Sequence, residues 1–162
     1  MIDMFSLLRR RSPHTLEHLR AEHAADCARL HALYFSHPWS VNEFESLIAS
    51  ANVHGAAALD GAGKVLGFVL VRLAADEAEI LTIAVDKSAR KQGIGRELLE
   101  NQAESLRRNR VRKLFLEVDE DNAAARKLYG KFGFTQAGMR PGYYRTASGK
   151  PANALILSCD LG

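Results

Sequence analysis

Two glycines, Gly93 and Gly95, mark the stretch of the chain best suited to bind an anion. The residues from Ile80 to Val85 form an apolar run typical of a buried strand, and from Ile94 onward apolar residues recur at helical spacing. A glycine-rich turn that leads into a helix exposes backbone N–H groups in front of the positive end of the helix dipole. This spacing predicts a phosphate site, with an ordinary strand-to-helix turn as the alternative interpretation.

The common nucleotide-binding motifs do not account for these glycines. A dinucleotide fingerprint requires a third small residue three positions after Gly95, where the chain has Leu98. A nucleoside-triphosphate loop requires Gly-Lys followed by Ser or Thr, whereas Gly63-Lys64 is followed by Val65. We therefore expect the phosphate to belong to another kind of ligand.

Glu117 and Tyr129 are the side chains whose types and surroundings suit proton transfer. Glu117 follows Phe115 and Leu116 in a segment predicted to be a buried strand, where a charged side chain is costly without a partner or a task. Tyr129 lies seven residues after Asn122, two helical turns or roughly 10 Å along the same helix face. A carboxylate paired with a lysine or arginine, and a tyrosine packed in the core, are the alternative interpretations.

The hydrophobic pattern predicts the elements that would position these groups, in one mixed α/β sheet with helices packed on its faces. Ser40 to Glu43 has the form of a capping box, and Asn122 is suited to cap a later helix. Arg90–Arg96 and Asp119–Asn122 both follow predicted strand ends, so both should open toward the same crevice. The predicted strands are Leu16–Arg20, Ala56–Leu59, Val65–Leu73, Glu79–Val85, Lys113–Val118, Phe134–Tyr144 and Ala154–Cys159, and the main predicted helix is Ile94–Arg108.

Length and composition indicate one domain. The chain has 162 residues and a net charge of +3, which suits an anionic ligand and does not require nucleic acid. Cys27 and Cys159 are its only cysteines, so a reducing cytoplasm is the simplest interpretation. The run Arg9–Arg11 follows the apolar start rather than preceding it, the reverse of a secretory signal, and no window approaches the ~20 apolar residues of a membrane span. We expect residues 1–13 to be an N-terminal extension and residues 14–162 to be the catalytic domain.

No metal site is expected. The six histidines fall in the first third of the chain, and none belongs to a zinc-protease helix motif or lies near a cysteine pair. We interpret them as surface or packing residues; they are His14, His18, His23, His31, His37 and His54.

The pattern Arg90-x-x-Gly93-x-Gly95 resembles the diphosphate loop of the GNAT superfamily of N-acetyltransferases, which bind acetyl-coenzyme A (acetyl-CoA). The resemblance implies a GNAT-like acyl-CoA N-acyltransferase fold, a single α/β (α+β) domain with a mixed, mostly antiparallel central sheet of about seven strands flanked by helices. A second GNAT-like pattern is an Asn-x-x-Ala-x-x-Leu-Tyr helix followed by Gly-Phe, here Asn122, Ala125, Leu128, Tyr129, Gly133 and Phe134.

Within this superfamily the chain is most similar to the RimI group, the bacterial ribosomal-protein alanine N-acetyltransferases. The similarity extends from about Leu16 to Cys159. It implies transfer of an acetyl group to the N-terminal α-amine of a protein, the N-terminal alanine of a small-subunit ribosomal protein. The narrower pattern consists of Pro38-Trp39-Ser40 with Phe44, Ile83-Ala84-Val85-Asp86, Leu116-Glu117-Val118 and Tyr143-Tyr144.

The resemblance also implies a role for each candidate site residue. Glu117 would be the general base and Tyr129 the general acid, while Trp39 and Tyr143 would bind the acceptor peptide. The other residues would bind acetyl-CoA: Ile83, Ala84 and Val85 its pantetheine arm, Arg90, Lys91, Gln92, Gly93, Ile94, Gly95 and Arg96 its diphosphate, and Asn122 the cofactor arm.

The expected chemistry is direct attack of an amine on a thioester. An α-amino group has a pKa of about 7.7 to 8.0 and is already partly neutral near pH 7, whereas a lysine side chain has a pKa of about 10.4. A carboxylate can accept the remaining proton, directly or through a water, and a tyrosine hydroxyl can protonate the leaving thiolate. No covalent enzyme intermediate is required, and neither cysteine lies near these motifs.

Several alternatives remain open at this level. The glycine loop would equally suit acetylation of a lysine side chain or a small-molecule amine, and a coenzyme A-binding module without turnover is a third interpretation. Asn153-Ala154 replaces the Asp-Ala common in the family, and Pro141-Gly142 is a second departure beside the expected acceptor groove. The basic run Arg107–Lys113 suits a helix C-terminus, so no direct contact with nucleic acid is expected. The oligomeric state is not predicted.

Overall fold

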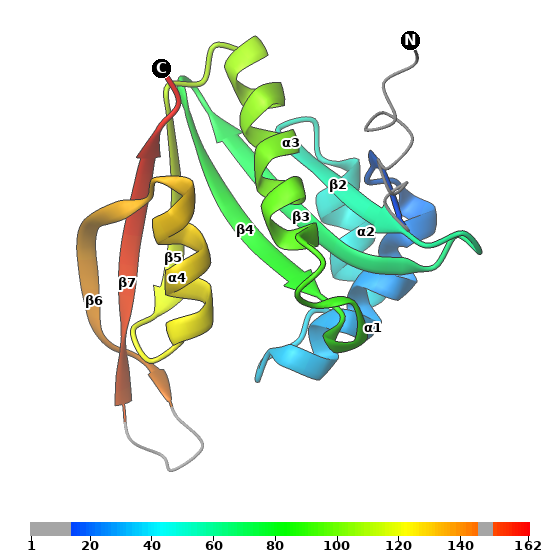
Figure 1. Cartoon of the computed structure of the whole chain (residues 1–162), viewed down its shortest axis with the longest axis horizontal. Coiled ribbons are helices and arrows are strands. Elements are labelled where there is room, and N and C mark those ends of the chain that lie inside the picture. Colours follow the sequence, from blue (N-terminus) through cyan, green and yellow to red (C-terminus); the bar gives the residue numbers. More distant parts are fainter. Residues whose placement is uncertain (1–13, 146–150) are drawn as a thin grey trace, which may run out of the picture.

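A seven-stranded sheet with helices on both faces forms the protein (Figure 1). The computed structural model describes residues 14–145 and 151–162. Its strands are β1 (Thr15–His18), β2 (Val53–Leu59), β3 (Val65–Ala74), β4 (Glu77–Val85), β5 (Lys113–Asp119), β6 (Thr135–Arg145) and β7 (Pro151–Asp160). Its helices are α1 (Ala24–Tyr34), α2 (Val41–Ala49), α3 (Ile94–Arg108) and α4 (Ala123–Phe132), with short 3-10 turns η2 (Ala21–His23) and η3 (Lys87–Ala89).

The strands lie in the order β1-β2-β3-β4-β5-β7-β6. Among the described strands β4 and β5 form the one parallel pair, and all other neighbours are antiparallel. A parallel pair needs a crossover connection, and α3 provides it. These observations confirm the predicted mixed, mostly antiparallel sheet.

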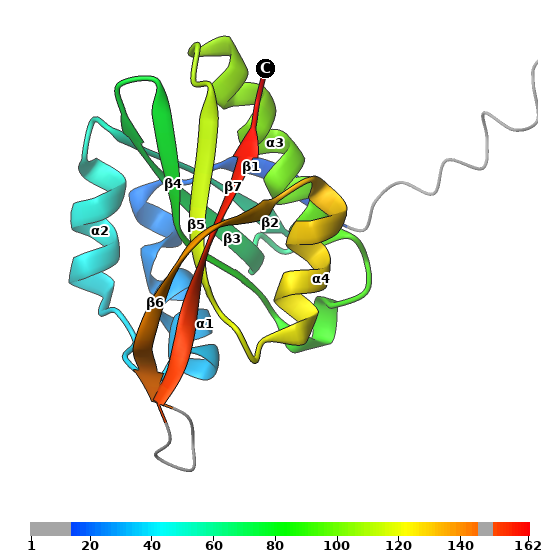
Figure 2. The same cartoon turned by 90° about the vertical axis from the view of Figure 1, so that its left-hand side faces the viewer.

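Helices α3 and α4 cover one face of the sheet, and α1 and α2 cover the other (Figure 2). An apolar cluster fills the space beneath each pair of helices. Beneath α3 and α4, side chains such as Leu98 pack against strand residues such as Leu116. Beneath α1 and α2, Leu30 and Phe44 pack with Phe68 of β3. Full burial of each such side chain contributes roughly 1.5–3 kcal/mol, so the helices are held mainly by their apolar faces.

Short sequence signals set the helix ends as predicted. The Glu43 N–H donates to Ser40 Oγ at 3.1 Å, and the Ser40 N–H donates to Glu43 Oε2 at 2.7 Å, which completes the capping box of α2. Asn122 Oδ1 caps α4 by accepting the Ala125 N–H at 3.1 Å. Gly133 ends α4 with a φ of 107°, a left-handed conformation that favours glycine.

Some strand boundaries differ from the prediction by a few residues. β1 covers Thr15–His18, the four residues that pair with β2, rather than the predicted Leu16–Arg20. β2 begins at Val53 rather than Ala56, because Val53 already pairs with Arg72 of β3. Side-chain pattern alone does not reveal where pairing with a distant strand begins.

Two sequence predictions concern residues that the structure does not describe. The N-terminal extension predicted for residues 1–13 lies outside the described residues, as does most of the loop predicted from Thr146 to Pro151. The domain boundary at residue 14 stays a prediction.

Candidate active site

β4 and β5 separate toward their carboxyl ends (Figure 1). Their pairing in the described sheet ends where Glu79 lies opposite Phe115. Directly afterwards β4 contains a β-bulge, in which Leu81 is an extra residue between two that pair with β3. A bulge bends its strand. The bulge therefore directs the rest of β4 away from β5 and frees the edges of both strands.

The freed edge of β4 offers main-chain hydrogen-bonding groups. Residues of an antiparallel pair alternate between bonding the partner strand and facing away from it. The Asp86 N–H donates to the Leu66 carbonyl of β3 at 2.7 Å, so by alternation Ala84 also bonds β3. The N–H and C=O groups of Ile83 and Val85 face the side of β5. Of the three residues predicted to hold the pantetheine arm, these two present main-chain groups to the opening.

The first turn of α3 has the backbone geometry that suits an anion. Gly93 precedes α3 with a φ of 79°, and no side chain of the described residues caps this helix start. The first N–H groups of an α-helix have no partner inside the helix. Ile94 is buried and anchors the turn in the core. The donor set fits a diphosphate such as that of acetyl-CoA.

Gly93 and Gly95 have different structural reasons to be glycine. A Cβ added at Gly93 would meet no atom within 4 Å, so the left-handed backbone is the constraint there. A Cβ added at Gly95 would lie 3.3 Å from Cδ2 of Leu128 and 3.8 Å from Cγ2 of Val85. The second glycine therefore lets α3 approach α4 and the end of β4 closely.

The side chain of Arg90 packs against the end of α1. Its guanidinium lies 4.6 Å from the centre of the Tyr34 ring, and its Nε donates to the Val85 carbonyl at 3.3 Å. The Tyr34 hydroxyl accepts the Lys87 N–H at 2.7 Å. These contacts fix the glycine loop against α1. A contact of Arg90 with the diphosphate stays a prediction.

Asp86 stabilises the turn that follows β4. Its Oδ1 accepts from the Ser88 hydroxyl at 2.7 Å and from the Ser88 N–H at 2.9 Å. The side-chain hydrogen bond, followed by the backbone one, holds the pKa of Asp86 below its usual value. Arg29 of α1 lies 3.7 Å from the other carboxylate oxygen. The aspartate of the motif is therefore a turn residue rather than a ligand.

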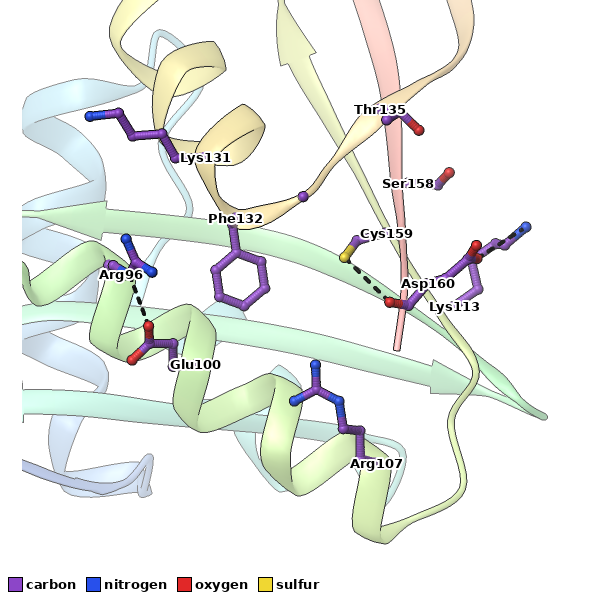
Figure 3. Close-up of a pocket in the computed structure, with 11 residues that line it drawn as sticks. Arg96, Glu100, Arg107, Lys113, Lys131, Phe132, Thr135, Ser158, Cys159 and Asp160 are labelled. Carbon is purple, nitrogen blue, oxygen red and sulfur yellow. Dashed lines mark hydrogen bonds and ion pairs between the residues drawn. The ribbon is translucent and has the colours of Figure 1, made fainter. Parts of the chain in front are cut away.

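The side chain of Arg96 faces an open hollow between α3, the end of α4 and β7 (Figure 3). Its Nε donates to Glu100 Oε1 at 2.8 Å. The hollow has a volume of about 700 Å³, and a second one of about 390 Å³ lies beside α4. Neither is lined by Glu117, Tyr129 or Gly93. The N–H of Arg96, not its guanidinium, is thus the group that lies at the helix start.

Glu117 extends from β5 on the face opposite α3 and α4. Its neighbours Leu116 and Val118 belong to the cluster beneath α3, and successive strand residues point to opposite faces. The side chain of Glu117 is 21% exposed, and its Oε1 lies 3.1 Å from Nε of Arg140 in β6. The carboxylate therefore has an arginine partner, as the alternative interpretation of the sequence predicted. It also has the access to solvent that a general base requires.

Tyr129 packs from α4 against the other face. It is buried, and its ring meets the edge of the Phe134 ring at 5.7 Å. Because Tyr129 and Glu117 belong to opposite faces of the sheet, an acid–base pair made from them would act through the opening between β4 and β5. Asn122 serves α4 as its N-cap, and its contact with the cofactor arm stays a prediction.

Trp39 lies in the connection between α1 and α2. Its backbone N–H donates to Nδ1 of His31 at 3.0 Å, and its ring stacks on the imidazole at 4.8 Å. The bond between Tyr34 and Lys87 holds the end of α1 at the carboxyl end of β4, so Trp39 lies at the same end of the sheet as the glycine loop. Tyr143 belongs to β6, and its side chain is outside the described part of the structure.

A family model described as the acetyltransferase (GNAT) family matches residues 24–134. The match covers more than half of the chain and includes the glycine loop, β5 and α4. The chain belongs to the GNAT family. It is therefore an acetyl-CoA-dependent N-acetyltransferase, as the sequence predicted.

Two relatives show where this GNAT chain lies within the family. It is 37% identical over 124 residues to the [Ribosomal protein bS18]-alanine N-acetyltransferase of Escherichia coli (strain K12), which covers 76% of the chain and 82% of the relative. It is 35% identical over 156 residues to the N-alpha-acetyltransferase RimI of Mycobacterium tuberculosis, which covers 93% and 94% of the two chains. These matches confirm the predicted similarity to the RimI group.

Solved structures confirm the GNAT fold. The crystal structure of the ribosomal-protein-S18-alanine N-acetyltransferase from E. coli matches with a TM-score of 0.85 and 31% identity, over 92% of this chain and 94% of that one. Arabidopsis thaliana NAA60 in complex with acetyl-CoA matches with a TM-score of 0.79 and 18% identity, over 91% and 98%. The second likeness is one of fold alone.

Asn153, which departs from the Asp common in the GNAT family, has a structural reason to be an amide. Its Oδ1 accepts the Gly142 N–H at 3.0 Å, and its Nδ2 donates to Glu120 Oε2 at 3.2 Å. An aspartate at this position would bring a second carboxylate against Glu120. The amide therefore suits the site, and it links the Pro141-Gly142 turn to the start of the loop before α4.

The described residues contain no group of three or more side chains that could hold a metal ion. Within the same ranges, no helix is long and apolar enough to cross a membrane. Three of the histidines are buried packing residues, namely His14, His23 and His31.

Sequence reasoning missed three features of this GNAT site. The bulge at Leu81 and the pairing of Arg140 with Glu117 depend on contacts between strands, for which the local pattern carries no signal. The third is Thr82, directly after the bulge in β4, which buries a hydroxyl for which the described residues offer no hydrogen-bond partner.

Proposed function

We propose that this GNAT enzyme transfers an acetyl group from acetyl-CoA to the N-terminal α-amine of a protein, and that its acceptor is the N-terminal alanine of ribosomal protein bS18. The observation that carries the proposal is the similarity to the bS18-alanine N-acetyltransferase of E. coli, 82% of whose length the chain covers. A ribosomal acceptor would put the reaction in the cytoplasm.

Acetyl-CoA would be held mainly by main-chain groups. The N–H groups from Lys91 to Arg96 would bind its diphosphate at the start of α3, in front of the helix dipole. Ile83 and Val85 would bind its pantetheine arm along the freed edge of β4. Because these donors belong to the backbone, their geometry depends on the fold rather than on mobile side chains.

Glu117 and Tyr129 would carry the two proton transfers. The carboxylate of Glu117 accepts a proton from the acceptor ammonium, directly or through a water, and the neutral amine attacks the thioester carbonyl carbon. The attack forms the C–N bond, and as the C–S bond breaks Tyr129 donates the proton that converts the leaving thiolate into a thiol. The nitrogen then loses its surplus proton to the tyrosinate, directly or through a water, which yields the neutral amide and restores Tyr129. The two residues approach from opposite faces, which suits an acceptor and a leaving group on opposite sides of the reacting carbon.

The acceptor peptide would lie on the Glu117 side of the sheet. Trp39, at the end of the sheet where β4 and the glycine loop meet, would contact its first residues. Tyr143 of β6 would contact it from the other side.

The test is an acetylation assay with three kinds of acceptor. The purified chain is incubated with acetyl-CoA and a short peptide beginning with Ala, with the same peptide blocked at its N-terminus but carrying a lysine, and with a polyamine. We expect acetylation of the free Ala peptide. Acetylation of only the lysine peptide or only the polyamine would contradict the proposal.

A further inference from the structure

His31, in the last turn of α1, forms the centre of an aromatic cluster beside the connection between α1 and α2. The imidazole stacks on Phe35 at 4.1 Å with an interplanar angle of 8°, and on Trp39 at 4.8 Å with an angle of 18°. The Phe44 ring meets it edge-on at 5.4 Å. His31 is only 3% exposed, so the ring is enclosed by these three neighbours.

The hydrogen bond from Trp39 fixes the state of the imidazole. Because Nδ1 of His31 accepts the Trp39 N–H, that nitrogen must be unprotonated. Burial favours the neutral ring and lowers the pKa of His31, while the carboxylate of Glu43 acts in the opposite direction. A protonated imidazole would turn a donor toward the Trp39 N–H and lose the bond.

The connection between α1 and α2 is short and anchored at both ends. α1 ends at Tyr34, whose hydroxyl bonds the Lys87 N–H, and α2 starts with the capping box of Ser40. Between these points His31 contacts the chain twice, through Phe35 and through Trp39. The position of the Trp39 indole therefore depends on the imidazole of His31, in the last turn of α1.

We propose that His31 is a positioning residue, which holds Trp39 in the orientation that contacts the acceptor peptide. The inference rests on the proposed function only for the last step, the contact between Trp39 and the acceptor. The first step, the hold on Trp39, can be tested without any substrate.

The first experiment uses the fluorescence of Trp39, the only tryptophan of the chain. His31→Phe keeps an aromatic ring in the stack and removes the Nδ1 acceptor, whereas His31→Asn keeps an acceptor and removes the ring. His37→Asn, an exposed histidine in the same connection, is the matched control. We expect acrylamide to quench Trp39 more strongly in both His31 variants than in the wild type and in the control. Unchanged quenching in folded His31→Phe and His31→Asn would overturn the inference.

The second experiment separates positioning from general damage to the fold. We expect the KM for the Ala peptide to rise about fivefold or more in His31→Phe, the ratio that corresponds to one lost hydrogen bond, while kcat and the KM for acetyl-CoA stay near the wild-type values. A variant that is merely destabilised would lose kcat and both affinities together, and its melting temperature identifies that case. An unchanged acceptor KM beside altered quenching would overturn the link between His31 and the acceptor.

Failure of the proposed function leaves a different signature. In that case the wild type does not acetylate the Ala peptide at all, and the quenching experiment still decides whether His31 holds Trp39.

Discussion

The carboxylate of Glu117 is paired with Arg140, whose Nε lies 3.1 Å from Oε1. Arg140 belongs to β6 and reaches Glu117 across β7, which lies between β5 and β6 in the sheet. The guanidinium is half exposed, so the pair contributes little to stability, of the order of 1 kcal/mol or less. We expect the pair to act mainly by orienting the carboxylate.

Replacement of Arg140 by Gln should therefore affect turnover more than stability. We expect kcat/KM for the Ala peptide to fall about tenfold, because Glu117, the proposed base, loses its ion-pair partner, while the free energy of unfolding changes by less than about 1 kcal/mol. Steady-state kinetics and urea unfolding measure the two effects. Arg108→Gln breaks an exposed helix pair with Glu104 and is the control, with wild-type kinetics expected. Equal kinetics in both variants would remove Arg140 from the site.

Glu117→Gln and Tyr129→Phe should each lower kcat by about 100-fold or more, the usual contribution of a general base or acid. Neither side chain is needed to bind the diphosphate, so calorimetry should give wild-type affinity for acetyl-CoA in both variants. A wild-type kcat in either one would exclude the role that we assign to that residue.

Replacement of Gly93 by Ala tests whether the left-handed backbone at this residue is needed to bind acetyl-CoA. Gly93→Ala forces a φ of 79° on a residue with a Cβ, which costs about 1 kcal/mol, and the loop can relieve this by moving the amides that we propose bind the diphosphate. We expect weaker binding of acetyl-CoA by calorimetry.

Gly63→Ala is the matched control for Gly93→Ala. Gly63 has a φ of 84°, an added Cβ meets no atom within 4 Å, and it lies in the turn between β2 and β3. The control should lose similar stability and keep its affinity. If Gly93→Ala also kept its affinity, the diphosphate would have to bind elsewhere.

The sequence predicted those features that depend on a few neighbouring residues. The capping box of Ser40, the cap of Asn122 and the bounds of α3 are confirmed, because such signals act within one helical turn. The hold of His31 on Trp39 and the pairing of Arg140 with Glu117 join segments whose contact depends on tertiary packing, so no local pattern could predict them. The bulge at Leu81 also depends on register with β3.

The stability of the protein should fall as the pH drops below about 6.5, and His31 should contribute to this loss. The folded state keeps His31 neutral because burial lowers its pKa, while the same histidine in the unfolded chain takes up a proton. The unfolded state then binds more protons, so the free energy of unfolding decreases until the pH reaches the lowered pKa of the folded state. Urea unfolding of the wild type and of His31→Phe, compared between about pH 7.5 and pH 5, measures the difference. An equally steep decline in both proteins would contradict it.

A peptide that carries both a free N-terminal alanine and an internal lysine makes the two amines compete in one molecule. After incubation with acetyl-CoA and the purified chain, tandem mass spectrometry locates the acetyl group. We predict that it is on the N-terminal fragment, because an α-amine with a pKa of about 7.7 to 8.0 loses its proton far more readily than a lysine side chain. Acetylation of the lysine with an unmodified N-terminus would contradict the function proposed for this protein.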